Sequence, residues 1–515
     1  MNTTCRTAVA LAAAGALAAA DGRPDILLVT TDDHGPHLGC LGTPGLRTPT
    51  FDALAAGGAL FRRHGCVMPT CSPARATILT GRSPTVHGML FNAAEWFGPQ
   101  PPADWPRGWV QLDRTLALPP QVPTMVELLR DRGYVTAITH KFHLASHARY
   151  PFDEWLPDAS TASLQRIYAR AATRPVMVMV NLRAPHRPYQ HHRNPGPAID
   201  PGRTEPPAYL PDTPALRADW SGYLGAVQAA DAQLGALRDA VAAVGRSASS
   251  VWIVTGDNGM PFHRAKMSAY PAGLAVPLII SGPGVAAGTR VDAGTSHLDI
   301  LPTVLDWAGI EAPAALEGTS LRAWAAGIAP DRDRAMTGMI HYGGNEAPPN
   351  AGTRAQQSRT IVIERRWCLI RRWHQDRPRR IPDDLKDPIA WRNEAYRATV
   401  DAREAWPLPY RLLREEEGIG SAPEELYDLD ADPWCTVNLA GSATAQPIMA
   451  RARAAMTVWQ ESAADPLAGA PLEAPPSSGG GGGGGCGPGS GLGAIVTFIA
   501  TGAMALLGRI RRRRA

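Results

Sequence analysis

The feature that most constrains the fold is an alternation of short apolar runs with helical patterns along the body of the chain. Residues 25–31, DILLVTT, have the length and apolar character that are typical of a central strand in a parallel sheet. Further runs of this kind occupy residues 135–139, 176–182 and 251–255, with 278–281 as another candidate. Helical patterns occupy residues 50–56, 124–132, 216–244 and 299–308. This order predicts a doubly wound α/β sheet.

Polar clusters lie where three of these predicted strands end. Asp32 and Asp33 follow the first run, residues 181–186 complete the third, and Asp257 and Asn258 follow the fourth. Loops at the carboxyl ends of parallel strands form the binding site in such sheets. Adjacent carboxylates repel each other unless a proton or a cation intervenes, and a hard divalent cation with oxygen ligands relieves that repulsion. Taken singly, an aspartate could also cap a helix, and D-N-G could be a simple turn.

The later part of the chain has a different pattern of predicted strands and helices. Strand-like runs at 360–363 and 368–371 and a helical pattern at 443–461 predict a smaller α+β subdomain, and an unbroken glycine run at 479–485 indicates a flexible linker. The predicted parts are a signal peptide (1–20), the α/β domain (21–330), the α+β subdomain (331–463), a linker rich in proline and glycine (464–490) and an apolar tail with an arginine cluster (491–515). The apolar stretch of the tail is slightly short for a membrane-spanning helix, and its basic end would stay on the cytoplasmic side.

The two ends of the chain also decide how its charge is interpreted. Residues 1–20 have a positive start, an alanine-rich apolar stretch and a small-residue cleavage site, which predicts a secretory signal. A buried N-terminal helix is the alternative, and it is disfavoured because a strand pattern begins directly afterwards. The formal net charge is +4, but six arginines lie in the leader and the tail, so the body carries about −2. This body has no basic stripe of the kind that binds nucleic acid, and no nucleic-acid partner is expected.

Export would place the body in an oxidising compartment, where its cysteines could form disulfides. Outside the leader, the tail and the motif described next, the cysteines are Cys40, Cys66, Cys368 and Cys435. They could form two disulfides, with Cys40–Cys66 and Cys368–Cys435 as the local pairing, or they could remain buried free thiols. The sequence leaves both possibilities open.

The strongest local signal is C-S-P-A-R at residues 71–75, followed by T-G-R at 80–82. Alone, this motif could mark a structural cysteine before a helix. Together with the strand-end clusters it resembles the motif of the sulfatase family, in which the cysteine is oxidised to formylglycine. Further similar segments are HKFH at 140–143, YPFD at 150–153, APHR at 184–187, GMPF at 259–262 and ELYDL at 425–429. Within the family this set looks most like the sulfamidases (N-sulfoglucosamine sulfohydrolases), and the resemblance covers roughly residues 24–462.

The resemblance implies an alkaline-phosphatase-like fold with a smaller C-terminal α+β subdomain, and a formylglycine made from Cys71. The calcium ligands that it implies are Asp32, Asp33, Asp257 and Asn258, with the modified Cys71 as a further ligand. The other implied site residues are Arg75, Lys141, His143, His186 and Lys266 for catalysis and Arg187 for substrate binding. The chain departs from the sulfamidase pattern at Phe142, where that pattern has a second lysine, and at Lys266, where it has arginine. These departures bear on the substrate more than on the chemistry.

The chemistry that the family implies is covalent catalysis with a built-in release step. One hydroxyl of the hydrated formylglycine attacks sulfur, and the other later expels sulfate and regenerates the aldehyde. Ca²⁺, Lys141 and Lys266 would bear the charge that develops on the sulfonyl oxygens. The roles expected of the remaining residues are a hydrogen bond to the hydrate for Arg75, steadying or deprotonating it for His143, and protonation of the leaving amine or alcohol for His186.

We therefore expect hydrolysis of sulfate from a sulfated saccharide, with N-sulfoglucosamine as the leading substrate. An O-sulfatase or a phosphonate or phosphate monoesterase on the same fold is the enzymatic alternative, because a metal site alone does not separate them. A surface glycan-binding protein with an inactive site is the non-enzymatic alternative, and the intact Cys71 and Arg75 argue against it. The expected partners are a maturation enzyme that makes formylglycine and, for the tail, a C-terminal sorting protease. The protein is expected in the periplasm or at the cell surface, anchored or processed at its C-terminus.

Overall fold

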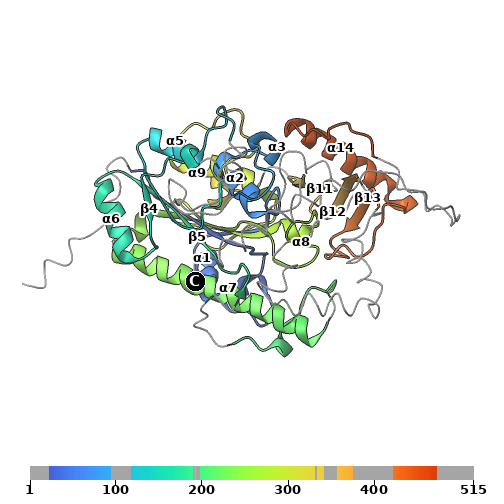
Figure 1. Cartoon of the computed structure of the whole chain (residues 1–515), viewed down its shortest axis with the longest axis horizontal. Coiled ribbons are helices and arrows are strands. Elements are labelled where there is room, and N and C mark those ends of the chain that lie inside the picture. Colours follow the sequence, from blue (N-terminus) through green and yellow to red (C-terminus); the bar gives the residue numbers. More distant parts are fainter. Residues whose placement is uncertain are drawn as a thin grey trace, which may run out of the picture. The chain divides into compact units, whose positions relative to one another are not determined.

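A mixed sheet forms the centre of the chain (Figure 1). The computed structural model describes residues 22–93, 118–145, 147–189, 192, 198–210, 212–330, 333–341, 357–374 and 422–472. The predicted signal peptide, the apolar tail and the linker beyond residue 472 lie outside the described residues. No helix within the described ranges is both long enough and apolar enough to cross a membrane.

The main sheet of the described chain has nine strands in the order β4-β3-β5-β1-β6-β7-β2-β8, with β9 paired to β2. Their bounds are β1 Asp25–Thr31, β2 Ala59–Gly65, β3 Val135–His140, β4 Glu154–Leu156, β5 Val176–Leu182, β6 Ser250–Gly256, β7 Ala275–Ser281, β8 Thr289–Val291 and β9 Thr295–Ser296. The five strands from β4 to β6 are parallel. Because Thr31 pairs with Leu182 of β5 and with Gly256 of β6, the carboxyl ends of the central strands meet at one edge.

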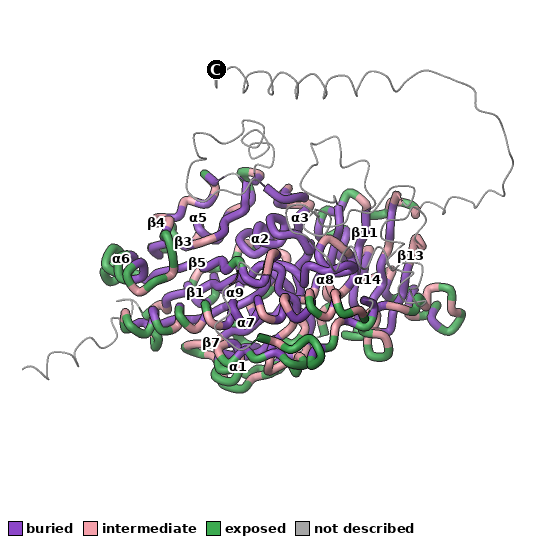
Figure 2. The backbone as a smooth tube through the Cα atoms, turned by 60° about the horizontal axis from the view of Figure 1, so that its bottom comes forward, coloured by how far each residue is buried: buried purple, intermediate pink, exposed green. Residues whose placement is uncertain are grey.

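Helices cover both faces of this sheet, as the two views in Figures 1 and 2 show. Their bounds are α1 Pro49–Ala56, α2 Cys71–Thr80, α3 Pro84–His87, α5 Met125–Asp131, α6 Thr161–Ala171, α7 Pro214–Ala243, α8 Pro271–Leu274, α9 Ile300–Trp307 and α10 Arg322–Ala325. Alternate side chains of β1 enter different cores: Ile26 and Leu28 pack with α2, α5 and α9, whereas Leu27 and Val29 pack with α1, α6 and α7. All seven β1 residues are buried, which explains why the sequence shows a continuous apolar run rather than an alternation.

The predicted doubly wound α/β sheet is confirmed, and the structure adds one feature to it. Strand β7 runs antiparallel to both β6 and β2, and the pairing with β2 is irregular between Phe61 and His64. The run at 278–281 therefore belongs to a reversed strand. An apolar run reads the same in both directions, so the sequence pattern could not give the orientation.

A second sheet of the described chain is antiparallel, with strands in the order β10-β11-β12-β13. Its strands are β10 Met336–Ile340, β11 Gln357–Ile363, β12 Trp367–Trp373 and β13 Glu424–Asp428, and helix α14, Gln446–Ser462, follows them. Met449 and Met456 of α14 pack against Ile361 and Leu369 of the sheet. This is the small α+β part that the sequence predicts. A buried, bidentate ion pair between Arg359 of β11 and Asp465 fixes the chain just after α14, with N–O distances of 2.6 and 2.7 Å.

The cysteines of the described residues are free thiols; Cys66, Cys368 and Cys435 are buried, as the second possibility left open by the sequence has it, whereas Cys40 is half-buried. Cys368 and Cys435 lie in one apolar cluster. Burial and a hydrogen bond with Cys368 raise the pKa of Cys435 well above its usual value.

Candidate active site

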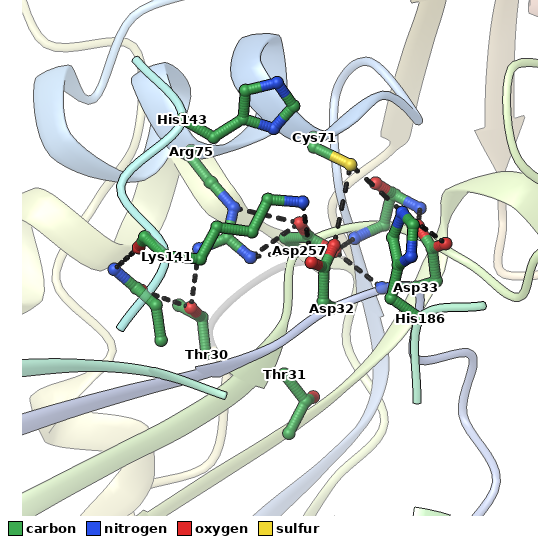
Figure 3. A network of polar contacts seen from close by, with 12 residues as sticks. Thr30, Thr31, Asp32, Asp33, Cys71, Arg75, Lys141, His143, His186 and Asp257 are labelled. Atoms are coloured by element: carbon green, nitrogen blue, oxygen red, sulfur yellow. Dashed lines mark hydrogen bonds and ion pairs between the residues drawn. The ribbon is translucent and has the colours of Figure 1, made fainter. Parts of the chain in front are cut away.

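The three polar clusters predicted at strand ends meet at the carboxyl edge of the main sheet (Figure 3). The backbone amide of Asp257 donates to the carbonyl of Thr31 at 2.9 Å, and the amide of Asp33 donates to Oδ1 of Asp257 at 2.9 Å. Asp33 has a φ of 60°, which turns the chain sharply after β1. Segments more than 220 residues apart in sequence thus hold their carboxylates together in a fully buried cluster.

Cys71 is the first residue of α2, and its side chain points at these carboxylates. Its Sγ lies 3.5 Å from Oδ1 of Asp32 and 4.0 Å from Oδ1 of Asp33. Burial raises the pKa of the Cys71 thiol well above its usual value, although Lys141 and Lys266 act in the opposite direction. A thiol in this state is a poor nucleophile at neutral pH. Residue 71 therefore points into the site, but its unmodified thiol is a poor nucleophile.

Cations pair with each carboxylate of the cluster. Nζ of Lys141 lies 2.6 Å from Oδ2 of Asp32, and Nζ of Lys266 lies 2.9 Å from Oδ2 of Asp33. Arg75, one helical turn after Cys71, binds Oδ2 of Asp257 through Nε at 3.0 Å and Nη2 at 2.8 Å. Burial works against ionisation of Asp32, but the surrounding positive charges, that of Lys141 first, together hold its pKa well below the usual range. Burial and the charge of Asp32 raise the pKa of Asp257 to about 6.

The choice of lysine in this cluster is itself informative. The chain has 51 lysine and arginine residues, of which only Lys141, Lys266 and Lys386 are lysine. Lys141 and Lys266 both point into the candidate site and are buried, while Lys386 lies outside the described residues. An ammonium group is a compact point charge, whereas a guanidinium is a broad planar fork. A chain that otherwise uses arginine therefore places lysine where two cations must fit beside two adjacent carboxylates.

The residues present fit a hard divalent cation. Ligand atoms of Asp32, Asp33, Cys71 and His186 lie within 4.8 Å of one another. Oδ1 of Asn258 is buried and has no hydrogen-bond partner among the described residues, while its Nδ2 donates to Oδ1 of Asp33 at 2.9 Å. An unsatisfied amide oxygen beside two carboxylates is the donor chemistry that Ca²⁺ uses.

Asp257 differs from Asp32 and Asp33 because a guanidinium and two backbone amides, rather than a lysine, bind its carboxylate. Oδ2 is bound by Arg75, and Oδ1 accepts from the backbone amides of Asp33 and Asn258 at 2.9 and 2.7 Å. His186, which the sequence suggested only as a proton donor, stands among the possible metal ligands, with Nε2 3.7 Å from Oδ2 of Asp33.

The remaining predicted residues lie around this cluster. The backbone carbonyl of His143 accepts from Oγ of Ser72 at 2.6 Å, which places His143 beside the start of α2. Arg187 is buried and forms a bidentate ion pair with Asp219 of α7, at 2.7 and 2.5 Å, and its Nε donates to the carbonyl of Pro261 at 3.2 Å. Its charge is thus already balanced by a protein carboxylate, and its role in substrate binding stays a prediction.

Sequence reasoning placed Asn181 in a polar cluster at a strand end but did not foresee Thr30 or the hydrogen bonds that join the two residues beneath the site. Oγ1 of Thr30 accepts from Arg75 at 3.1 Å and donates to Oδ1 of Asn181 at 2.5 Å. Nδ2 of Asn181 in turn donates to the carbonyl of Lys141 at 2.5 Å. This chain of hydrogen bonds links Arg75 to the backbone of Lys141 across three strands. The signal for Asn181 was a single polar residue near the end of an otherwise apolar strand.

The chain was compared with known proteins. A sequence model of the sulfatase family matches residues 24–157 and 147–310. The chain is 26% identical over 494 residues to N-sulphoglucosamine sulphohydrolase of Homo sapiens, covering 86% of this chain and 91% of that protein. Among solved structures, a 2-O GAG sulfatase is similar with a TM-score of 0.59 at 18% identity, covering 88% of this chain and 95% of the other. A phosphonate monoester hydrolase from Silicibacter pomeroyi is similar with a TM-score of 0.58 at 19% identity, covering 85% and 95%. The family match extends over more than half of the chain and includes every strand of the main sheet, so this protein belongs to the sulfatase family of hydrolases.

Proposed function

We propose that this hydrolase removes the sulfuryl group from the nitrogen of N-sulfoglucosamine residues, using formylglycine made from Cys71 and one bound Ca²⁺ ion. The observation that carries the proposal is the convergence of two buried lysines and two buried carboxylates on Sγ of Cys71. Sequence similarity to a human N-sulphoglucosamine sulphohydrolase along most of both chains supports sulfamate as the substrate class.

The proposed Ca²⁺ ligands are the oxygens of Asp32, Asp33 and Asn258, together with Asp257 and the modified residue 71. When bound, the ion would neutralise the anionic substrate and polarise a sulfonyl oxygen. Formylglycine would supply the nucleophile that the high-pKa thiol of Cys71 cannot provide.

The positions of the chain's own residues suggest a different catalytic role for each of them. Lys141 and Lys266 carry the positive charge that a sulfonyl group needs as negative charge develops on its oxygens. Arg75 holds Asp257 in place and faces the start of α2, where it can hydrogen-bond the modified side chain. His186 is 28% exposed, more than either lysine or Arg75, so it stands on the solvent side of the cluster. That position suits a group that delivers a proton to the leaving amine.

Kinetic comparison on three substrates tests the substrate class. We expect kcat/KM on N-sulfoglucosamine to exceed that on 6-O-sulfated glucosamine and on a phosphonate monoester. The phosphonate substrate is included because a phosphonate monoester hydrolase has the same fold. A higher kcat/KM on the sulfate ester would remove the sulfamidase assignment, and preference for the phosphonate would remove the sulfatase substrate altogether.

Two chemical measurements test the cofactors independently of turnover. Mass spectrometry of the peptide that contains Cys71 should show an aldehyde in place of the thiol when the maturation enzyme is present. Elemental analysis should find about one calcium per chain. Zinc in its place, or wild-type turnover from protein that is shown to be unconverted, would contradict the proposed chemistry.

We also propose that the chain is exported and is anchored or processed at its C-terminus, by a sorting protease in the second case. The sequence order of glycine linker, Cys486, apolar stretch and arginine cluster supports this proposal. Cell fractionation of the full chain beside a chain that ends at Ser478 tests it. Equal amounts in the soluble fraction, with Ala515 retained in the intact mass, would remove both roles of the tail.

A further inference from the structure

The loop that carries Lys266 is held partly by its own hydrogen bonds, such as that from the amide of Lys266 to the carbonyl of Met260 at 3.1 Å, and partly by contacts with its surroundings. It leads from β6 to α8 and folds over the candidate site, with the amide of Met267 donating to the carbonyl of Pro69 at 2.8 Å, close to Cys71. Arg264 and Met267, on either side of Lys266, have φ values of 56° and 61°. Such left-handed conformations are unfavourable for residues other than glycine and persist when surrounding contacts fix them. Contacts outside the loop therefore help to fix its conformation.

Helix α7 supplies part of that support through Phe262, and the small sheet supplies another part through a buried polar network. The hydroxyl of Tyr270, at the end of the loop, donates to Oε2 of Glu425 on β13 at 3.1 Å and accepts from Nη2 of Arg372 on β12 at 3.0 Å. Arg372 and Glu425 form a bidentate pair at 2.7 and 2.8 Å, and Tyr427 donates to Glu425 at 2.8 Å. Figure 1 shows α8 next to β12, so the network lies where the main domain meets the small sheet. We call Tyr270, Arg372, Glu425 and Tyr427 the latch.

Arg264 ties the other side of the loop to the same surface. Its Nη2 donates to the carbonyl of Cys435 at 2.7 Å, and its guanidinium lies 3.9 Å from the ring centre of Tyr270. The ring of Tyr270 thus contacts Arg264 on the loop side, while its hydroxyl contacts the small sheet. Lys266 lies between these two anchors in sequence, with its own Nζ on Asp33.

We propose that the latch is a positioning element for Lys266, so that the small sheet sets where this cation stands in the active site. The proposal rests on the proposed function in assigning Lys266 to charge stabilisation. A latch that merely joined two parts of the chain would affect folding stability and leave the placement of Lys266 unchanged. The two cases differ in what happens to kcat and to the accessibility of the Lys266 amine.

The chain offers a matched control for the latch. Arg359 and Asp465 form another fully buried bidentate ion pair on the same small sheet, and Asp465 lies after α14 rather than at the Lys266 loop. Glu425→Gln and Asp465→Asn each replace a carboxylate by its neutral amide and leave a buried guanidinium without its counter-charge. Tyr270→Phe is the milder second variant, because it removes one hydroxyl and keeps the ring that Arg264 contacts.

The experiment uses the full chain and reads out both amine reactivity and kinetics. Folded protein is treated briefly with an amine-acetylating reagent, and peptide mass spectrometry gives the acetylation of Lys266 relative to Lys141. With three lysines in the chain, the pattern is simple to assign. We expect Glu425→Gln to raise this ratio by about tenfold, through looser closure of the loop. We expect its kcat to fall by about ten- to hundredfold with KM changed by less than about twofold, and Tyr270→Phe to show a smaller effect of the same kind.

Asp465→Asn should lower the melting temperature to a similar degree while it keeps kcat and the Lys266-to-Lys141 ratio of the wild type. The proposal is overturned if Glu425→Gln, or Tyr270→Phe where the former does not fold, behaves as this control does. If the wild type lacks sulfamate or sulfate hydrolysis, the proposed function fails, while the acetylation ratio still decides whether the latch positions Lys266.

Discussion

Acid should destabilise this protein because it contains histidines that its fold holds in the neutral form. His87 is fully buried, its Nε2 is bonded to Oγ1 of Thr77, and its Nδ1 accepts from the amide of Met89 at 3.1 Å. His341 presents Nδ1 to Nη2 of Arg359 at 3.1 Å, so that nitrogen must also accept. His297 donates to the carbonyl of Gly256 through Nε2 at 3.0 Å, and its Nδ1 is buried. In His87 and His341, protonation would place a second donor against a group that itself donates, and in His297 it would leave a buried donor without an acceptor.

The sign and size of the effect follow from proton linkage. Burial lowers the pKa of His87, His297 and His341 from 6.5 to about 3. Below pH 6.5 the unfolded chain therefore binds protons that the folded chain does not bind. The contribution of these rings to the free energy of unfolding is fully present above that pH and declines as pH falls towards 3. Between pH 7.5 and 5.0 each ring removes about 2 kcal/mol from the free energy of unfolding, or about 6 kcal/mol together.

Buried carboxyls whose pKa is raised act in the opposite direction, and Asp25, which lies away from the candidate site, is an example. Burial raises the pKa of Asp25 to about 6, so the folded chain binds a proton between pH 6 and 3.8 that the unfolded chain does not. This contributes about 1.4 kcal/mol of stability at pH 5 and is lost as pH rises through 6. For these three rings and Asp25 together, the loss is about 4 to 5 kcal/mol, which is comparable with the whole stability of a typical domain, about 5 to 15 kcal/mol.

Denaturant unfolding at a series of pH values between 7.5 and 5.0 measures this loss. His341→Gln supplies the matched variant, because its amide oxygen can still accept from Arg359 and it does not titrate. It should reduce the slope of stability against pH by about 1.4 kcal/mol per pH unit near pH 5. Stability that stays flat from pH 7.5 to 5.0, or an unchanged slope in His341→Gln, would refute the reasoning.

Three further predictions concern the candidate site. Cys71→Ala should abolish turnover while circular dichroism and the melting temperature stay near wild type, since a small buried side chain is lost; turnover that survives would exclude residue 71 as the nucleophile. Asp257→Ala should lower calcium content and activity together and reduce the free energy of unfolding by about 3 to 5 kcal/mol, because buried Arg75 loses its counter-charge; an unchanged denaturation midpoint would contradict this. Lys266→Met should reduce kcat by about 10²- to 10³-fold with the fold intact, and a change confined to KM would assign Lys266 to substrate binding alone.

The residues that sequence reasoning identified were those whose signal is local. Asp32, Asp33, Asp257 and Asn258 each directly follow an apolar run, and the carboxyl edge of a parallel sheet brings such residues together whatever lies between them. The bounds of β1 and β5 could be predicted to the residue because both strands are buried on both faces. The family resemblance then supplied the lysines and histidines, which no local pattern distinguishes from surface residues.

What the sequence could not supply were partnerships between distant side chains. The pairing of Arg187 with Asp219 spans 32 residues, and that of Arg372 with Glu425 spans 53. Both depend on the relative placement of segments that the apolar pattern leaves undetermined. The reversed direction of β7 was missed for the same reason, since neighbouring strands rather than its own sequence decide it. The scarcity of lysine was a usable signal: a residue type that appears three times in 515 residues is informative wherever it stands.

The burial of Cys71 limits the time during which its thiol is accessible to other proteins. The thiol is 1% exposed in the folded chain, and the wall that encloses it includes Asp257 and Asn258, which follow β6. While the chain is being made, residue 71 emerges long before β6 exists to pair with β1, so the thiol cannot yet be enclosed. At ordinary synthesis rates of about 5 to 20 residues per second, this interval lasts on the order of ten to forty seconds. If Cys71 is converted as proposed, the modifying enzyme would have to act before β6 folds against β1, and slower synthesis or folding would raise the converted fraction.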